Sequence, residues 1–303
     1  MTDPKMPRAE PTDSGVAGRG LLMGLAEVVP GVSGGTMAFI SGIYPQLVGA
    51  LAAFGPGSIA MLKDPLKFWT HHNLRFLLVL ALGMGLGVMV FAQVVHFILA
   101  HFQPLLWAFF SGVIAMSVVA IGRYRQRSAL MLWGSLGLVS GLGILWLPVL
   151  QTEPSSWLVL LGGALAVCAW LLPAISGSYV LLALGLYTPV ITAVAQFDIT
   201  LLATLAAGCA IGLLAFAKTL SWLLRHHSEP LLSLLTGFML GSLPKLWPWQ
   251  DGAALEVSDR LLTPASYAAM AQVPAYLPWA VLMFVLGAVF LWLLTLLDTS
   301  RED

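Results

Sequence analysis

The sequence has few charged residues. Asp, Glu, Lys and Arg make up 9% of its 303 residues, whereas a soluble globular chain carries about 25%. So few charges do not cover a folded surface of this size, and the mean hydropathy is +0.90. This composition excludes a water-soluble enzyme, a nucleic-acid-binding protein and a disordered scaffold. It predicts an all-α integral membrane protein, because apolar runs without alternation of period two form helices in a bilayer rather than a barrel.

Cysteine is also scarce, and the charges balance. The two cysteines, Cys168 and Cys209, each lie inside an apolar run, which excludes a disulfide framework. The net charge is zero, so no overall basic field attracts nucleic acid. The polar N-terminal segment, residues 1–18, lacks an apolar core, and we expect no cleavable signal peptide. The histidine pairs have no carboxylate or cysteine companions at ligand spacing, so we expect neither a metal nor a cofactor.

Long apolar runs, in contrast, are abundant. A membrane-spanning helix needs about 20 mostly apolar residues. Six runs qualify or nearly qualify, at residues 74–99, 105–121, 129–150, 199–224, 231–247 and 276–297. We therefore expect a polytopic protein with about six transmembrane helices in one transmembrane domain, residues 1–303.

Two further apolar segments, residues 20–54 and 157–196, are interrupted near their middle. The interruptions read Pro30-Gly31-Val32-Ser33-Gly34-Gly35-Thr36 and Pro173-Ala174-Ile175-Ser176-Gly177-Ser178. Proline removes a backbone donor and glycine frees the backbone, so each helix is expected to break there. Each segment is then either a re-entrant hairpin or a pair of full crossings.

The two interruptions match each other, which predicts an internal repeat. With a shift of 143 residues, the matched pairs are Ser33 with Ser176, Gly34 with Gly177, Gly42 with Gly185, and Tyr44 with Tyr187. With a shift of 125 residues, they are Gly83 with Gly208, Gly87 with Gly212, and Gly112 with Gly237. We assign repeat one to residues 15–121, with an insertion near 54–72, and repeat two to 157–247. Residues 129–150 would connect the repeats, and an external loop, 248–275, would precede the last span, 276–297.

The basic residues predict the orientation. Arg123, Arg125 and Arg127 form the densest basic loop, which the positive-inside rule places in the cytoplasm. If each broken segment enters and leaves on one side, both termini are cytoplasmic, and Lys245 falls on the outer side. Hairpin one then opens from the cytoplasm and hairpin two from the opposite side. This arrangement is an inverted-topology repeat, which many secondary transporters share.

The start of a half-helix at each break is a candidate anion site. Free N–H groups and the positive end of the helix dipole favour phosphate, and serine or threonine hydroxyls add donors. The predicted substrate-binding residues are Glu27, Pro30, Ser33, Gly34, Gly35, Thr36, Ser176, Gly177, Ser178 and Lys218. The alternative is that such clusters only kink the helices and let neighbouring helices pack closely.

Two of these residues carry charge inside apolar segments, which makes them functional candidates. Glu27 could carry a proton and couple transport to protons or sodium ions, cap the hairpin tip, or repel an anion. Lys218 could neutralise a phosphate, pair with Glu27, or extend toward the cytoplasmic end near Arg225.

The first interruption lies in the motif Ala26-Glu27-Val28-Val29-Pro30-Gly31-Val32-Ser33-Gly34-Gly35-Thr36, which is followed by Gly42-Ile43-Tyr44. The second copy reads Pro173-x-x-Ser176-Gly177-Ser178 and is followed by Gly185-Leu186-Tyr187. This doubled motif resembles the PopT-type family of bacterial membrane proteins. The resemblance covers residues 15–297. It implies a transporter, not an enzyme, in the bacterial cytoplasmic (inner) membrane. Its partner would be undecaprenyl phosphate or a related polyprenyl phosphate, moved from the outer to the cytoplasmic leaflet so that the carrier lipid is recycled in cell-envelope synthesis. Ala174 departs from the family, in which glycine usually follows this proline.

Two other functions stay open. Undecaprenyl-diphosphate phosphatases resemble this chain in a Pro-Gly-x-Ser element, but theirs continues with an arginine and is accompanied by a glutamate cluster. Here Gly34 stands at the arginine position, and Glu27 has no second carboxylate nearby in the sequence. An inorganic anion channel or exchanger is the other alternative, because helix N-termini in the membrane also suit chloride.

Overall fold

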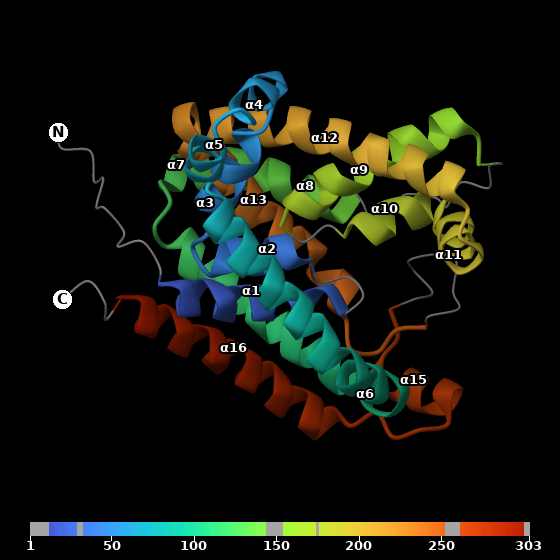
Figure 1. Ribbon diagram of the computed structural model, residues 1–303. Helices are drawn as coiled ribbons and strands as arrows, with labels where there is room; N and C mark the ends of the chain where they lie inside the picture. The colour runs from blue at the N-terminus through green and yellow to red at the C-terminus, as the bar shows by residue number, and fades with distance from the viewer. Residues whose placement is uncertain (1–11, 29–32, 144–153, 174–175, 252–260, 300–303) are drawn as a thin grey trace.

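The computed structural model describes residues 12–28, 33–143, 154–173, 176–251 and 261–299. Within these residues the regular elements are helices (Figure 1), apart from one antiparallel bridge between Gln250 and Leu261. The prediction of an all-α fold is confirmed.

The first part of the chain forms three short helices, an inserted pair and one long helix. These are α1 (Asp13–Val28), α2 (Gly34–Ile40), α3 (Tyr44–Ala52), α4 (Pro56–Met61), α5 (Pro65–His71) and α6 (Leu74–Gly122). A connecting segment follows, with α7 (Arg127–Ala129), a π-helical stretch (Leu130–Gly134) and α8 (Ser135–Gly143). The remainder contains α9 (Ser156–Leu171), α10 (Gly177–Ala183), α11 (Tyr187–Gln196), α12 (Ile199–His226), α13 (Ser228–Ser242), a 3-10 helix (Leu243–Leu246), α15 (Pro264–Ala271) and α16 (Leu277–Thr299).

The longest helix, α6, contains two of the predicted spans. Its 49 residues bend at Phe102, where φ is −138° and ψ is 36°. Pro104 follows two residues later, and a proline inside a helix removes a backbone donor and crowds the preceding turn. Residues 74–99 and 105–121 are therefore the two arms of one kinked helix.

By length and composition, α6 and α12 are each able to cross a membrane, and counting each bent helix pair as one span raises this to four among the described residues. The predicted span at 231–247 coincides with α13 and the 3-10 helix that follows it, and the predicted span at 276–297 coincides with the apolar helix α16. The predicted span at 129–150 is described only to residue 143, the end of α8.

The two bent pairs, α2–α3 and α10–α11, share one turn. The helix axes bend by 119° and 108° respectively. Each bend has a glycine with positive φ, Gly42 at 77° and Gly185 at 71°, a conformation that other residues adopt at a cost. Both turns close with the same backbone hydrogen bond over five residues, from Ile43 to Ala38 (3.1 Å) and from Leu186 to Leu181 (2.8 Å).

Helix packing also repeats between the two halves. In the first half α1 packs on α6, and in the second half α9 packs on α12. Gly83 lies directly against the carbonyl of Ala17, and Gly208 lies against that of Leu160, so a Cβ at either glycine would clash with backbone. Leu160 follows Ala17 by the same 143 residues that align the two breaks. Residues matched in the sequence therefore make matched contacts.

The same holds for the outer helices. Gly112 of α6 lies against the backbone of Phe284 in α16, and its counterpart Gly237 of α13 lies against the backbone of Gly134. The α16 helix thus packs on the second arm of α6 as the segment around α8 packs on α13.

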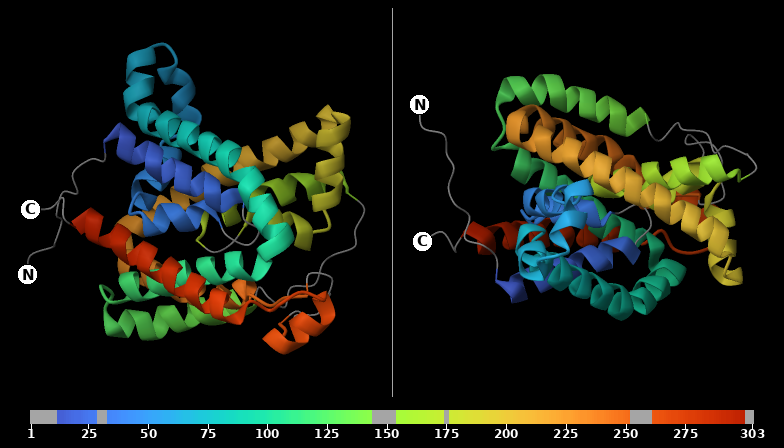
Figure 2. Two further views of the ribbon diagram at one scale, coloured as in Figure 1. Left: turned by 90° about the horizontal axis from the view of Figure 1, so that it is seen from below. Right: turned by 45° about the horizontal axis from the view of Figure 1, so that its top comes forward.

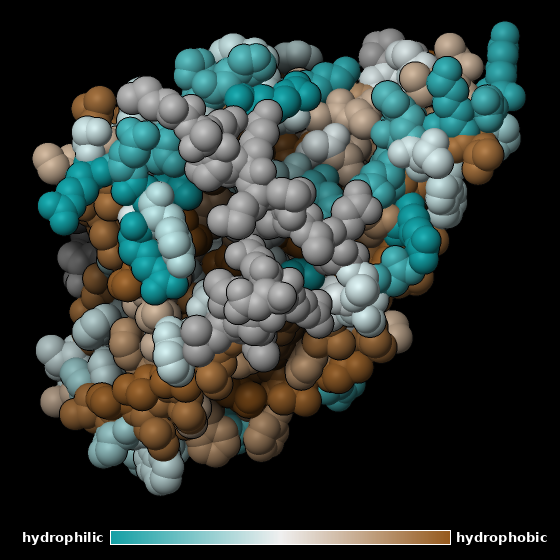
Figure 3. All heavy atoms as spheres, turned by 90° about the vertical axis from the view of Figure 1, so that its left-hand side faces the viewer, coloured by the Kyte–Doolittle hydropathy of each residue, from teal (hydrophilic) through white to brown (hydrophobic). Residues whose placement is uncertain are grey.

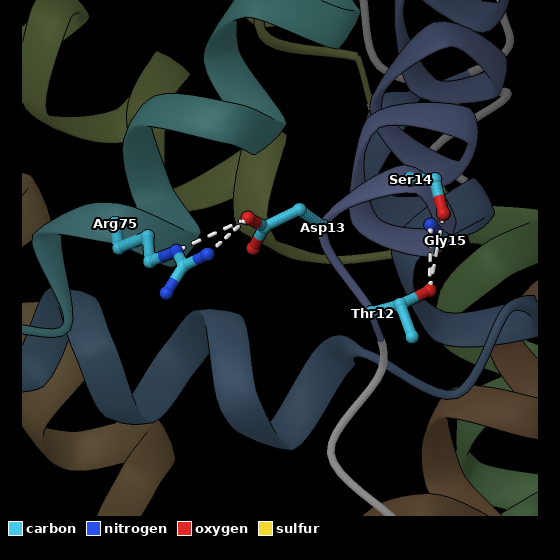
Figure 4. Close-up of polar contacts among 5 residues, drawn as sticks. All are labelled: Thr12, Asp13, Ser14, Gly15 and Arg75. Carbon is cyan, nitrogen blue, oxygen red and sulfur yellow. Dashed lines mark hydrogen bonds and ion pairs between the residues drawn. The ribbon is translucent and has the colours of Figure 1, made fainter.

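The pair α1–α6 and the pair α9–α12 begin at opposite ends of the molecule. Both Nε and Nη2 of Arg75, at the start of α6, bind Oδ2 of Asp13, at the start of α1, at 3.1 and 2.5 Å (Figure 4). Both helices begin on the left-hand side of Figure 1, where α7 lies and α16 ends, whereas α9 and α12 begin on the right-hand side. The arms α1 and α9 therefore approach each other from opposite ends.

The predicted insertion forms α4 and α5. These two short helices project beyond their neighbours in the left-hand view of Figure 2. A buried histidine holds the pair together: His72 Nε2 lies 2.7 Å from Ser58 Oγ, and its Nδ1 lies 2.8 Å from the carbonyl of Phe68. The second half has no counterpart, because α11 ends at Gln196 and α12 begins at Ile199.

Large apolar side chains point outward from several helices. Exposed examples are Leu78, Leu82, Leu86, Met89 and Phe97 on α6, Met131, Leu136 and Val139 around α8, and Val281, Leu282, Val285 and Val289 on α16. Figure 3 shows the end where α1 begins, with hydrophilic residues over its upper part and hydrophobic residues along its lower part. Extended apolar surface on helices already packed together fits contact with lipid, as in a multi-pass membrane protein.

Candidate functional site

The two interrupted segments meet inside the molecule at Trp170, near the end of α9. The indole Nε1 of Trp170 donates a hydrogen bond to Oε1 of Glu27 at 2.8 Å. The backbone carbonyl of Trp170 accepts a hydrogen bond from Oγ of Ser33 at 3.3 Å. Trp170 follows Glu27 by 143 residues, so each occupies the position of the other in its own half. Contact between matched positions of the two hairpins brings the two interrupted segments together.

At hairpin one, the first amides of α2 are hydrogen-bonded within the protein. Gly34 donates its N–H to Oε1 of Glu27 at 2.7 Å. Gly35 donates to Oγ of Ser33, the N-cap, at 3.1 Å, and Thr36 donates to the carbonyl of Ser33 at 2.9 Å. Of the roles considered for Glu27, capping the tip is the one that the hydrogen bonds describe: its carboxylate binds the positive end of α2.

This tip is buried. The Ser33 side chain is 1% exposed and Thr36 is fully buried, and six of the seven residues of α2 are buried. A Cβ on Gly35 would lie 2.5 Å from the carbonyl oxygen of Trp170. Glycine is therefore required here for the two hairpins to approach, as the packing interpretation of these clusters predicted. The substrate-binding role of these residues stays a prediction.

Hairpin two has the same sequence pattern in a different environment. Ser176 precedes α10, but its side chain makes no capping bond, and its Oγ lies 2.7 Å from Oγ of Ser178. Ser178 is exposed, Ser176 and Gly177 are half-buried, and no residue of α10 is fully buried. The hydroxyls of hairpin two are thus accessible, whereas that of Ser33 is enclosed.

The remaining predicted site residues lie elsewhere or outside the described residues. Lys218 is exposed on α12, and a Cβ on Gly55, just before α4, would lie 2.5 Å from its Nζ. The ammonium is therefore beside the insertion, whereas the Glu27 carboxylate accepts hydrogen bonds from Gly34 and Trp170. Pro30 and Ala174 lie outside the described residues.

Trp170 and Lys245 are not among the residues that the sequence pattern predicts to bind substrate. The repeat offset would have identified Trp170 as the counterpart of Glu27. Lys245, on the 3-10 helix after α13, places its Nζ 3.8 Å from the ring centroid of Tyr179, the residue after Ser178. The only signal of Lys245 in the sequence is its place at the end of an apolar run, which indicates orientation rather than binding. Within the described ranges, no group of three or more His, Cys, Asp or Glu residues is placed to hold a metal ion.

Comparison with known proteins identifies relatives along most of the chain. The profile of the VCA0040-like family, described as undecaprenyl phosphate translocase-like, matches residues 23–263. A polyprenyl-phosphate transporter of Vibrio cholerae is 38% identical over 287 residues, which cover 90% of this chain and 92% of the relative. A polyprenyl-phosphate transporter of Staphylococcus aureus is 27% identical over 264 residues, 76% of this chain and 84% of the relative. No solved structure matches the chain.

Proposed function

The chain belongs to the undecaprenyl phosphate translocase-like family, and on that premise we propose that it moves undecaprenyl phosphate from the outer to the cytoplasmic leaflet of the bacterial inner membrane. It is a transporter of a lipid phosphate rather than an enzyme, as its named relatives indicate. Inward movement returns the carrier lipid to the leaflet where cell-envelope synthesis uses it again.

The observation that supports this proposal best is the contact of Glu27 with Trp170, which joins two broken hairpins that arrive from opposite ends of the molecule. We propose that the halves form an inverted-topology repeat with re-entrant hairpins and both termini in the cytoplasm. Hairpin one then gives access from the cytoplasm and hairpin two from the outside. Alternating access around a fixed central site is the mechanism that such repeats support.

In this scheme the two hairpin tips hold the phosphate headgroup in turn, and the prenyl chain stays in lipid. Ser176, Gly177 and Ser178 receive the headgroup from the outer leaflet. Ser33, Gly34, Gly35 and Thr36 receive it on the cytoplasmic side. We place Lys218 nearer the cytoplasmic end, as a cation that the departing headgroup passes.

Glu27 provides a physical reason for ion coupling. Its carboxylate accepts a hydrogen bond from the backbone N–H of Gly34 at the start of α2. A phosphate bound at hairpin one would need this same N–H group. Two anions at one helix terminus repel each other, so phosphate binding at hairpin one requires the carboxylate to take up a proton, pair with a cation or move away. A proton or sodium ion that enters with the lipid meets this requirement.

The test of direction is carried out in cells that lack the protein and are complemented by variants. We expect undecaprenyl phosphate exposed on the outer surface to accumulate without the protein and to fall with the wild type. It should stay high with a Ser33→Ala/Ser176→Ala double variant and fall with Ser140→Ala, an exposed serine on α8. Unchanged surface exposure in the deletion would contradict inward transport.

Reconstitution separates the alternatives. Purified protein in liposomes should move a polyprenyl phosphate between leaflets without hydrolysing it. Release of inorganic phosphate from undecaprenyl diphosphate would favour the phosphatase, and chloride or phosphate flux without lipid movement would favour the anion channel.

Cysteine labelling tests the topology. In a variant without Cys168 and Cys209, a membrane-impermeant maleimide should label Ser178→Cys from the outside and Ser128→Cys only from the cytoplasm. Ser33→Cys should resist labelling from both sides, since its side chain is enclosed. Labelling of both exposed positions from one side would contradict the inverted topology.

A further inference from the structure

Lys245 is held at a fixed place beside hairpin two. Its backbone carbonyl accepts a hydrogen bond from Nε2 of Gln250 at 2.8 Å, and the carbonyl of Leu246 accepts one from the buried Oγ of Ser111 on α6 at 2.8 Å. The 3-10 helix that carries Lys245 is thus tied to the second arm of α6 and to the loop after it. Because hydrogen bonds hold the carbonyls of both Lys245 and Leu246, the position of the Lys245 backbone relative to α6 is fixed.

The ammonium of Lys245 faces an aromatic ring rather than a carboxylate. Its Nζ lies 3.8 Å from the ring centroid of Tyr179, and the residue is half-buried. The ring face attracts a cation but accepts none of the three N–H bonds that an ammonium donates. Lys245 takes no part in the ion pairs of Arg75 with Asp13 and of Arg125 with Glu229 in the described part of the chain. A half-buried cation with this donor capacity is suited to bind an anionic ligand.

Two hydroxyls lie shortly before Tyr179 in the chain, the residue whose ring faces this cation. Tyr179 directly follows Ser178, whose Oγ lies 2.7 Å from that of Ser176. Ser178 is exposed, so an incoming ligand can reach the pair. Each hydroxyl can exchange its bond to the other for a bond to a phosphate oxygen. This leaves the number of hydrogen bonds no lower than before.

We propose that Lys245, Ser176 and Ser178 form the outer binding site for a phosphate monoester headgroup, with Tyr179 positioning the ammonium. The proposal rests on the proposed function and adds to it the residue that neutralises the headgroup. The shared chemistry is a phosphate dianion, which is supplied by the monoester headgroup of a prenyl phosphate in the outer leaflet or by free inorganic phosphate.

The test uses the full-length protein in detergent, with farnesyl phosphate as a short prenyl phosphate and inorganic phosphate as the free ion. Lys245→Gln should weaken farnesyl phosphate binding about tenfold or more, because a charge-assisted hydrogen bond is lost. Lys245→Arg should bind within about threefold of the wild type. The control is Lys63→Gln, which removes an exposed lysine between α4 and α5 and should leave binding unchanged. Binding by the wild type should also weaken more steeply with salt than binding by Lys245→Gln.

The outcomes separate this inference from the proposed function. Wild-type protein that moves polyprenyl phosphate in liposomes, with unchanged binding by Lys245→Gln, overturns the role of Lys245 alone. Wild-type protein that neither binds farnesyl phosphate nor moves polyprenyl phosphate overturns both. Inorganic phosphate that binds as tightly as farnesyl phosphate identifies the free ion as the ligand and overturns a lipid headgroup site.

If Lys245→Gln fails to fold, a second pair of variants still tests the site. Lys245→Met keeps the apolar stem, and Ser178→Ala removes an exposed hydroxyl whose loss spares the core. Both should elute as the wild type does in size-exclusion chromatography and bind farnesyl phosphate more weakly, Lys245→Met by about tenfold. Wild-type binding by both variants overturns the site.

Discussion

The two broken hairpins have the same sequence pattern and the same backbone turn, but their surroundings differ. In hairpin one, Tyr44 is 1% exposed, whereas its counterpart in hairpin two, Tyr187, is 42% exposed. Gly42 and Gly185 adopt nearly the same left-handed φ in both. The comparison teaches that local sequence determines how each hairpin turns, while its neighbours determine whether it is open.

Different packing partners explain the asymmetry. The α3 helix packs against α12, and α2 packs against α1 and α9, so hairpin one is enclosed by both halves. Its residues Met37, Phe39 and Leu47 belong to the main core cluster. Hairpin two packs mainly on α9 and the start of α12. Under the proposed function, this arrangement corresponds to a state closed at hairpin one and open at hairpin two.

The largest effect is expected from removing the carboxylate that joins the hairpins. Glu27→Ala leaves the N–H groups of Gly34 and Trp170 without an acceptor in a part-buried site. Each unsatisfied donor costs about 1–3 kcal/mol, so the free energy of unfolding should fall by about 2–6 kcal/mol. Thermal denaturation in detergent, followed by tryptophan fluorescence, measures the loss.

The matched variants are Glu27→Gln and Trp170→Phe. Glu27→Gln keeps an acceptor oxygen, so it should express normally but abolish or decouple transport, since the charge is gone. Trp170→Phe removes one donor and should destabilise by about 1–3 kcal/mol. Transport by Glu27→Gln with unchanged dependence on protons and sodium would remove Glu27 from the coupling mechanism.

The two serines should separate stability from binding. Ser33 Oγ is buried and makes two hydrogen bonds, and loss of an N-cap costs about 0.5–2 kcal/mol. We therefore expect Ser33→Ala to lower the free energy of unfolding by about 1–2 kcal/mol. The hydroxyl of Ser176 makes no capping bond. Ser176→Ala should therefore change the free energy of unfolding by less than about 0.5 kcal/mol but weaken prenyl phosphate binding. Equal losses of stability in the two variants would contradict the asymmetry.

The two turn glycines should respond alike. An L-residue in the left-handed region costs about 1–2 kcal/mol, so Gly42→Ala and Gly185→Ala should each lower the free energy of unfolding by about that amount. A matched pair of denaturation curves measures this. A loss of stability in only one of the two variants would contradict the view that both glycines are needed for the shared left-handed turn.

The smallest effect is expected at the tyrosines that follow the turns. The hydroxyl of Tyr44 is buried without a hydrogen-bond partner among the described residues. Removing an unsatisfied polar group is neutral or stabilising, so Tyr44→Phe should leave the midpoint of thermal denaturation unchanged or raise it slightly. Tyr187→Phe, which alters an exposed ring, serves as the control. A clear loss of stability in Tyr44→Phe would show that its hydroxyl has a partner.

Sequence reasoning identified the all-α membrane class, both breaks, the matched turns and the insertion. It succeeded because these features depend on local chemistry: apolar run length, proline and glycine, and residues repeated at constant offsets. The two adjacent spans that it predicted, residues 74–99 and 105–121, are the two arms of α6 on either side of the kink at Phe102. Sequence reasoning did not connect Lys245 with hairpin two, because these residues are far apart in the chain.

By itself, the sequence determined where the backbone breaks and turns, because a glycine at positive φ or a proline acts on its own few residues. Only the tertiary structure decided that Glu27 caps its own hairpin, that Trp170 joins the two halves, and that Lys245 faces Tyr179. Those outcomes depend on which helices pack together, and packing brings side chains from distant segments to one place.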